Sequence, residues 1–535
     1  MLTKMLREEW GFAGLVMSDW GAVNDRVAAL AAGLDLEMPS SGGVNDARLV
    51  DAVQRGELPE QLLDQAASRV LQLLDRVEPD VLDGAGFDAA AHHRLAREAA
   101  AECAVLLKND GDLLPLDATG AAPIAVLGEL ARSPRYQGAG SSQVNPTELL
   151  SALAEIRALT ERPVTFAPGY LVDRAGDAGE ERELRAAAVT AAARAEVVLL
   201  FLGLPPSFES EGWDRTSIDL PPEQVRLLTE VAEANANLVV VLSNGGVVSV
   251  APWQHLVPAL LEGWLLGQAG GGAIADLLFG HASPSGRLAE TIPLRLEDNP
   301  SFGNFPGELG EVRYGEGLLV GYRHYDTRLM PVAYPFGHGL SYTSFAYSDL
   351  SAAADGTDVL VQVTVRNTGS RPGAEVVQVY RHEAAGAVLH PTRELVAFEK
   401  VLLQPGEMRT VELRVRRREL AYYHVRRGGW VVESREVLFE VGSSSRDIRL
   451  SVPVAVQGDA GAEPLRADSS LEEWLVHPAG GPLLRQQLAR TGAGLLGQTE
   501  DVLHLLGNFP LSRLAMMPDT GLDAAAVAEL LDRLG

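Results

Sequence analysis

Cysteine is almost absent from the sequence, and so are the motifs that bind zinc. The one cysteine, Cys103, lies at the start of the apolar run 103–107, and a single thiol cannot close an internal disulfide. We therefore expect Cys103 to be a buried, small apolar side chain. The sequence has neither a CxxC pair nor an HExxH helix, so neither a structural nor a catalytic zinc is indicated.

Long hydrophobic runs and an excess of basic residues are also lacking. No segment reaches the ~18 consecutive apolar residues that a membrane span needs, and residues 1–10 are amphipathic and charged, unlike a signal peptide. The sequence thus predicts a soluble, cytoplasmic protein. With 45 Lys and Arg against 72 Asp and Glu, the net charge is −27. Such a chain repels nucleic acid and anionic membranes, so neutral or cationic partners are favoured.

What is present is an ordinary globular composition, with 46% hydrophobic and 22% charged residues over 535 positions. This length favours three or four domains. In residues 1–90, the apolar runs 14–18 and 34–38 predict two buried strands, and 45–77 has helical spacing interrupted at 56–59. The pattern is typical of a parallel α/β architecture, but two strands cannot make a closed sheet.

Residues 91–298 form a second α/β pattern. The strand candidates are 124–128, 164–167, 197–203, 238–243 and 258–265. Ala-rich helical stretches, notably 180–195 and 222–234, separate them. This alternation predicts right-handed crossovers and a mostly parallel sheet with helices on both faces.

The hydrophobic period changes to two in the last third of the chain. After a Gly/Pro-rich linker, 299–354, the segment 355–457 reads as a β-sandwich of the immunoglobulin or fibronectin type III kind. Runs 359–365 and 375–380, joined by a turn at 367–369, look like a hairpin. The other strand candidates are 395–400, 408–415, 430–434 and 437–441. Residues 458–535 read as a helical extension that begins with a Gly/Ala-rich linker at 458–463.

Asp19 follows the predicted strand 14–18 directly, at the carboxyl end, where parallel α/β folds place their chemistry. Its neighbours Ser18 and Trp20 offer a hydroxyl donor and an aromatic face for a sugar ring. Taken alone, however, an Asp after a strand also fits a helix cap or a turn residue.

A second acidic group follows the predicted strand 197–203. Glu209 and Glu211 stand one residue apart, close to Asp214 and Arg215. In such a cluster the pKa of one carboxyl can be raised by apolar or like-charged neighbours while another pairs with arginine. The alternative is a solvated acidic loop that caps the helix beginning near Pro221.

Residues 6–22, which contain Ser18-Asp19-Trp20, resemble the nucleophile segment of glycoside hydrolase family 3. The run 32–39 is similar to the family's last barrel strand. The resemblance implies that Asp19 attacks the anomeric carbon of the substrate and that Ser18 and Trp20 contact the sugar.

The resemblance continues into the acidic loop and beyond. Residues 211–215 (Glu-Gly-Trp-Asp-Arg) and 220–224 match the segment by which family members lend an acid/base Glu to the barrel. It implies that Glu211 is the acid/base, with Glu209 as the alternative because loop lengths differ, and that Arg215 and Asp214 anchor the loop. The Gly-rich loop 137–142 resembles one that approaches the active-site mouth, and it lacks the spacing of a nucleotide-binding motif. Residues 335–343 are similar to the link into a fibronectin-like domain.

The resemblance implies hydrolysis of terminal β-linked sugars of the β-glucosidase type, by a retaining double displacement that needs no cofactor. Substrates would be β-linked oligosaccharides or glycosides. Family members build a (β/α)₈ barrel of ~250 residues, whereas residues 1–90 hold material for roughly two of its eight strands. We therefore expect the C-terminal part of a TIM barrel, poorly stable and inactive alone.

Four other arrangements also fit the sequence. The chain could act as a homo-oligomer or take the missing barrel from a partner chain. It could be a non-catalytic remnant that binds carbohydrate or a partner, or a binding module based on the sandwich.

Overall fold

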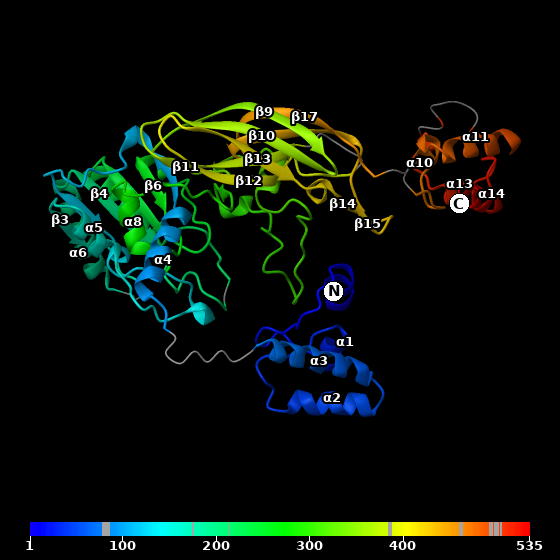
Figure 1. Cartoon of the computed structure of the whole chain (residues 1–535), viewed down its shortest axis with the longest axis horizontal. Coiled ribbons are helices and arrows are strands. Elements are labelled where there is room, and N and C mark those ends of the chain that lie inside the picture. The colour runs from blue at the N-terminus through cyan, green and yellow to red at the C-terminus, as the bar shows by residue number, and fades with distance from the viewer. Residues whose placement is uncertain are drawn as a thin grey trace. The chain divides into compact units, whose positions relative to one another are not determined.

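The computed structural model describes residues 1–77, 86–173, 176–212, 214–382, 388–459, 464–491, 496, 502 and 505–534. The chain forms two compact units, Met1–Asp88 and Ala89–Gly535 (Figure 1). None of the described helices is long and apolar enough to span a bilayer.

The first unit is mainly helical. Its helices are a π-helical segment, η1 (Leu2–Glu9), and the α-helices α1 (Arg26–Ala31), α2 (Val44–Gln54) and α3 (Glu60–Arg76). The interruption between α2 and α3 lies where Gly56 and Pro59 predict it. The two strands expected at 14–18 and 34–38 are reduced to one parallel bridge between Met17 and Leu36. Two short segments without further strand neighbours gain too little pairing to form longer ladders.

The second unit begins with a six-stranded sheet. Its strands are β1 (Val105–Asn109), β2 (Ile124–Leu127), β3 (Val164–Ala167), β4 (Val197–Gly203), β5 (Leu238–Ser243) and β6 (Ala259–Glu262). The order is β1-β6-β5-β4-β2-β3. The pairings among β2 to β6 are parallel, as expected, because apolar runs buried on both faces suit a covered parallel sheet. The sequence reading missed β1, an edge strand antiparallel to β6.

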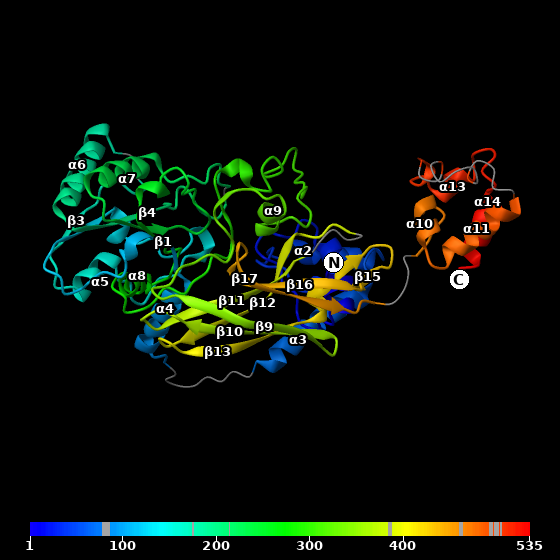
Figure 2. The ribbon, with the colours of Figure 1, turned by 90° about the horizontal axis from the view of Figure 1, so that it is seen from above.

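Helices cover both faces of this sheet. Helices α4 (Ala89–Cys103), α5 (Ala152–Leu159) and α8 (Gly270–Leu278) lie on one side, and α6 (Ala178–Arg194) and α7 (Pro222–Ala234) on the other (Figure 2). Cys103 is exposed, so the expected burial is wrong. Helix α4 buries Ala100 and Ala101 against the sheet, and Cys103 falls outside that face.

The β-sandwich has two antiparallel sheets, ordered β13-β10-β9 and β12-β11-β16-β17. Their strands are β9 (Phe345–Asp355), β10 (Asp358–Asn367), β11 (Gly373–His382), β12 (Arg393–Leu403), β13 (Met408–Val415), β16 (Arg435–Ser444) and β17 (Asp447–Val456). The expected hairpin between β10 and β11 is wrong, because β10 pairs with β9 and β13 while β11 pairs with β12 and β16. Asn367 fixes the crossing, since its Nδ2 donates to the carbonyls of Arg371 and Leu403.

The stretch 299–354, expected to be a linker, contains regular structure. It holds α9 (Tyr322–Thr327), β8 (Val332–Tyr334), which pairs with β7 (Ile292–Pro293), and most of β9. A small hairpin, β14 (Tyr422–His424) and β15 (Gly429–Val431), adjoins the sandwich. The 3₁₀ helices are η2 (Asp110–Asp112), η3 (Glu129–Ala131), η4 (Gly140–Ser142), η5 (Gln254–Leu256), η6 (Leu296–Asp298) and η7 (Arg417–Leu420).

The C-terminal segment is helical and has a core of its own. Its helices include α10 (Leu471–Val476), α11 (Gly480–Thr491), α13 (Leu511–Leu514) and α14 (Ala524–Asp532), which pack around Trp474 and neighbouring leucines. Of the expected linker 458–463, residues 460–463 lie outside the described residues.

Candidate active site

Asp19 lies in the first unit, two residues after the bridge that joins Met17 to Leu36. Asp19 is exposed, and its carboxylate accepts no hydrogen bond from the residues that the structure describes. The backbone carbonyl of Asp19 accepts the amide of Ala22, so a tight turn follows it. An exposed, unengaged carboxylate at this position is free to meet a reacting atom.

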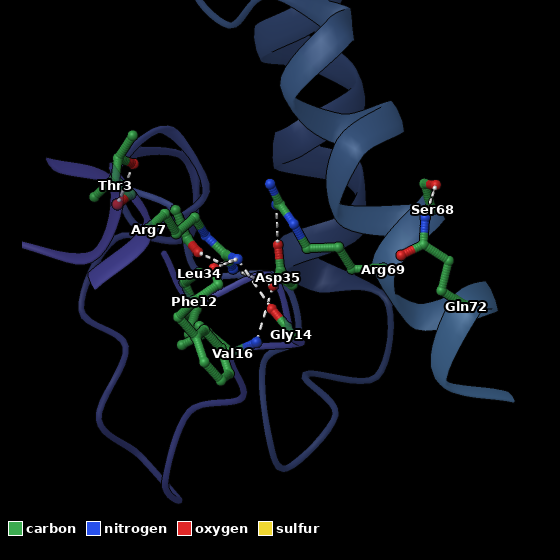
Figure 3. Close-up of polar contacts among 12 residues, drawn as sticks. Thr3, Arg7, Phe12, Gly14, Val16, Leu34, Asp35, Ser68, Arg69 and Gln72 are labelled. Atoms are coloured by element: carbon green, nitrogen blue, oxygen red, sulfur yellow. Dashed lines mark hydrogen bonds and ion pairs between the residues drawn. The ribbon is translucent and has the colours of Figure 1, made fainter. Parts of the chain in front are cut away.

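A buried carboxylate, Asp35, holds together the segments that carry Asp19 (Figure 3). Arg7 Nη2 lies 2.6 Å from Asp35 Oδ2, and Arg69 Nη1, from α3, lies 2.8 Å from Oδ1. The amide of Val16 donates to the same Oδ2 at 2.9 Å. Because both oxygens are engaged by charged or backbone donors, Asp35 ties η1, the Asp19 segment and α3 to one point.

Ser18 and Trp20 flank Asp19 but differ in role. The Ser18 hydroxyl donates to the Met38 carbonyl at 3.1 Å and accepts from the Met38 amide at 2.8 Å. The expected donation from Ser18 to a sugar therefore finds no support, since its hydroxyl completes the pairing of the two chain segments. Trp20 is 62% exposed, so its indole is available to a ligand.

The second candidate carboxylate, Glu209 or Glu211, lies in a loop at the point where the strand order of the parallel sheet reverses. Strand β3 pairs with one edge of β2, and the next strand in the chain, β4, pairs with its other edge. The topological switch point of the sheet is therefore between β2 and β4. Open α/β sheets bind ligands outside the carboxyl ends of the strands at this point. The Gly-rich loop 137–142 follows β2, and the loop with Glu209 and Glu211 follows β4.

Glu209 is fixed by the protein itself. Its Oε2 accepts the amide of Gly245 at 2.7 Å, and its Oε1 accepts that of Gly246 at 2.6 Å. Arg135 Nη1 lies 3.2 Å from Oε2, and the Glu209 side chain is 16% exposed. Since both oxygens already have donors, Glu209 is a structural anchor for its loop.

Glu211 is exposed and makes contact with one residue of the Gly-rich loop. Its Oε2 accepts the amide of Ser141 at 2.5 Å and the Ser141 hydroxyl at 2.6 Å. These hydrogen bonds, first that of the hydroxyl and then that of the amide, lower the pKa of Glu211 below its ordinary value. Of the two glutamates, Glu211 is therefore the one with a carboxylate open to an incoming ligand.

The anchoring roles expected of Arg215 and Asp214 divide. Arg215 Nη1 donates to the Val247 carbonyl at 3.0 Å and lies 3.7 Å from Glu209 Oε1, so Arg215 does anchor the loop. Asp214 is exposed and has no polar partner within the described part of the chain, because Arg215 is engaged elsewhere. Trp213, the middle residue of the motif 211–215, lies outside the described residues.

The motif at 220–224 serves the end of β4. Gln224 Oε1 accepts the amide of Gly203, and its Nε2 donates to the Gly203 carbonyl, both at 2.9 Å. Leu220 and Gln224 are buried. This two-bond clamp fixes the point at which the acidic loop leaves the sheet.

A set of buried polar groups near the loop with Glu209 and Glu211 was not predicted from the sequence. Glu262, at the end of β6, accepts the amide of Trp264 and the Nδ2 of Asn244. Burial, and secondarily the nearby Glu290 and Glu209, raise the pKa of Glu262 to about 8. Burial also raises the pKa of Glu290. A glutamate at the end of an apolar strand, such as Glu262, is a sequence signal that could have indicated a functional group. Asn244, Gly245 and Gly246 showed no such signal in the sequence.

No group of histidine, cysteine, aspartate and glutamate side chains within the described ranges is arranged to hold a metal ion. The exposed carboxylates of Asp19 and Glu211 are groups that can perform nucleophilic attack and proton transfer.

Three family descriptions match the chain. The glycosyl hydrolase family 3 N-terminal domain matches residues 1–73, the C-terminal domain of the same family matches 104–342, and a fibronectin type III-like domain matches 375–445. The first two contain Asp19 and Glu211, respectively.

Curated relatives and a solved structure agree with these matches. The chain is 45% identical to an exo-alpha-(1->6)-L-arabinopyranosidase of Bifidobacterium breve, over 97% of this chain and 70% of the relative. It is 43% identical to thermostable beta-glucosidase B of Acetivibrio thermocellus, over 100% of this chain and 71% of the relative. The crystal structure of a Bifidobacterium adolescentis GH3 beta-glucosidase superposes with a TM-score of 0.84 at 48% identity, covering 90% of this chain and 70% of that one. The chain thus belongs to glycosyl hydrolase family 3 and is a glycoside hydrolase.

Proposed function

We propose that this glycosidase hydrolyses terminal sugars by a retaining double displacement, with Asp19 as nucleophile and Glu211 as acid/base. The observation that carries the assignment is the contrast between two glutamates one residue apart. Glu209 has both oxygens bound by the amides of Gly245 and Gly246, whereas Glu211 is exposed and held only by Ser141.

The two steps follow from this assignment. In the first, an Asp19 oxygen bonds to the anomeric carbon while protonated Glu211 gives its proton to the departing glycosidic oxygen. In the second, ionised Glu211 takes a proton from water, the water oxygen bonds to the anomeric carbon, and the bond to Asp19 breaks. Trp20 supplies an apolar face beside the nucleophile, on which a sugar ring can stack. No step requires a cofactor.

The first unit is proposed to be the C-terminal part of a (β/α)₈ barrel. The match of residues 1–73 to the family's N-terminal domain supports this, as does the parallel bridge before Asp19. Trp10, Phe12 and Met17 are exposed in this unit, which suits a surface that further barrel strands cover. We propose that further barrel strands pack on this surface and complete the fold around Asp19.

The relatives suggest two substrate classes. One has a name that specifies an L-arabinopyranoside, and others have names that specify β-glucosides. In both sugars the scissile bond can be equatorial, so the same pair of carboxylates serves either. We propose β-glucosides as the primary substrates, and p-nitrophenyl derivatives of the two sugars, compared by kcat/KM, test the choice.

The roles of the carboxylates are tested with added azide, which replaces a missing carboxylate. Asp19→Gly should lose about 10⁴-fold in kcat/KM and, with azide, yield the inverted α-glycosyl azide. Glu211→Gln should retain attack on substrates with a dinitrophenyl leaving group, because these need no acid, and yield the β-glycosyl azide. Glu209→Gln is the matched control: it should weaken turnover without azide rescue.

Three results would distinguish the proposal from its alternatives. Azide rescue of Glu209→Gln but not of Glu211→Gln would transfer the acid/base role to Glu209. A folded chain that binds sugar, shows no turnover and is unaffected by Asp19→Asn would instead indicate a non-catalytic binding remnant. Turnover that appears only after addition of a chain with barrel strands would indicate a partner-supplied barrel.

A further inference from the structure

The contact between Ser141 and Glu211 joins the two loops that flank the switch point of the sheet. Ser141 follows β2 and Glu211 follows β4, 70 residues apart in sequence. Both Ser141 donors reach the same oxygen, Oε2, at 2.5 and 2.6 Å. The other oxygen, Oε1, accepts no hydrogen bond from the described residues, so Ser141 holds one oxygen of Glu211 and leaves the other without a donor among those residues.

We propose that Ser141 is a positioning residue for the reaction: its amide and hydroxyl orient the Glu211 carboxylate and stabilise the ionised form that accepts a proton from water in the second step. This inference rests on the acid/base role proposed for Glu211. Ser141 itself touches no reacting atom.

The loop around Ser141 is closed at its base by hydrogen bonds between its own residues. Gln137 Oε1 accepts the amide of Val144 at 3.0 Å, and its Nε2 donates to the Val144 carbonyl at 3.2 Å, which closes the loop at its base. Because these bonds involve no residue of the acidic loop, they hold the loop around Ser141 independently of Glu211 and reduce the ordering needed to place its donors.

Gly140 gives the carboxylate its room. Its φ of +83° is strained for any residue with a side chain, and a Cβ there would lie 2.5 Å from Glu211 Oε2 and 2.7 Å from Glu211 Cβ. A glycine at this position therefore allows both the turn and the close approach of Glu211 to the Ser141 donors.

Charged groups of the surrounding elements do not replace this contact. Arg135 pairs with Glu209, Arg215 donates to the Val247 carbonyl, and Asp214 is exposed. None of them forms an ion pair with Glu211 among the described residues. The proton affinity of Glu211 within this unit is thus set by Ser141, whose hydrogen bonds lower the pKa of Glu211.

The consequence differs between the two steps. Donors to the ionised carboxylate favour the base role and oppose the acid role, since they make the proton easier to lose. Removing the hydroxyl should raise the pKa of Glu211, extend the first step to higher pH and slow the second. A residue that merely stabilised the fold would affect both steps alike.

The test is a titration of the Glu211 carboxyl in the full chain, by NMR with ¹³C at the glutamate side-chain carboxyl and Glu211→Gln to assign the signal. Ser141→Ala should shift its midpoint upward, and Ser141→Thr, which keeps a hydroxyl, should restore it. Ser142→Ala is the matched control, because the Ser142 hydroxyl contacts the Ala139 carbonyl at 3.5 Å instead. Gly140→Ala should also shift the midpoint upward by displacing the carboxylate from Ser141.

A midpoint unchanged in both Ser141→Ala and Gly140→Ala would overturn the proposal, whatever the activity. In kinetics, the alkaline limb of kcat/KM should move up in Ser141→Ala while kcat for substrates limited by the second step falls. A shifted midpoint together with normal turnover of Glu211→Gln would contradict the acid/base assignment and leave the contact between Ser141 and Glu211 standing. Failure of the Ser141 proposal and failure of the acid/base assignment of Glu211 are therefore distinguishable.

Discussion

The first unit and the α/β sheet of the second carry one proposed catalytic carboxylate each, but they are stabilised differently. The core of the first unit consists of a few buried side chains, namely Leu30, Leu49, Ala52, Leu58 and Ala66. The α/β domain buries whole strands, with every residue of β2, β4, β5 and β6 buried. The first unit relies instead on the buried charges around Asp35.

The two carboxylates are therefore held in position by different interactions. Asp19 depends on a polar network whose loss a small core cannot offset. Glu211 stands on a loop whose base is fixed by a large apolar sheet and by the Gln224 clamp. Substitutions in each unit should therefore have different consequences for the two carboxylates.

Replacing the buried acid of the first unit should unfold that unit alone. Asp35→Ala leaves Arg7 and Arg69 without their shared partner, at a cost of about 3 to 5 kcal/mol. Hydrogen exchange followed by mass spectrometry should show lost protection in residues 1–77 and unchanged protection in β2 to β6. Asp64→Ala, at an exposed position of α3, is the control. Retained protection in Asp35→Ala would show that the network is dispensable.

A cavity in the sheet should destabilise the α/β domain and leave the first unit unchanged. Leu199 of β4 is fully buried, so Leu199→Ala should lower the free energy of unfolding of the α/β domain by about 2 to 5 kcal/mol. Leu95→Ala on α4 makes the same change at a side chain that is 64% exposed and should have little effect. Denaturant unfolding, with exchange to locate the change, measures both. Equal effects of the two substitutions would contradict the burial argument.

Removing the clamp at the end of β4 should have a smaller, more local effect. Gln224→Ala leaves the amide and carbonyl of Gly203 without their partners, at a cost of about 1 to 3 kcal/mol. We expect faster exchange in the acidic loop and lower kcat/KM. Gln404→Ala, at an exposed position, should change neither. If the loop exchanges no faster, the clamp does not position it.

A pH dependence of stability should be confined to the second unit. Burial raises the pKa of Glu262 from 4.5 to about 8, so between these values the folded protein holds a proton that the unfolded chain lacks. Its stabilising contribution is full below about pH 4.5 and is lost as pH rises through 8, with a slope of at most about 1.4 kcal/mol per pH unit. Glu262→Gln should flatten this slope in unfolding titrations. An unchanged slope would show that Glu262 is ionised in the folded state.

Particular elements show what the sequence could predict. Strands β2 to β5 were predicted closely because each is an unbroken apolar run bounded by helical stretches. Strand β1 was missed because Val105, Leu106 and Leu107 follow α4 directly and continue its apolar pattern. The turn at 367–369 has the residues of a hairpin, and only the tertiary bonds of Asn367 show that the chain crosses to the other sheet.

The site was predicted to the level of candidate residues. The two glutamates were identified, but their neighbours Gly245, Gly246 and Ser141 lie far along the chain from them. Those contacts decide which carboxylate is fixed and which is open, and they depend on loops brought together at one edge of the sheet. Neither residue type nor spacing encodes that arrangement.

The most direct test of a catalytic Asp19 is covalent trapping on the intact chain. A 2-deoxy-2-fluoro-β-glucoside with a dinitrophenyl leaving group accumulates as a glycosyl-enzyme, because the fluorine slows both steps and the leaving group speeds the first. Digestion and peptide mass mapping should place the label on Asp19 in the full chain, and Asp19→Asn should take up none. A label on another residue, or no label on a preparation that hydrolyses the dinitrophenyl glucoside, would contradict this assignment.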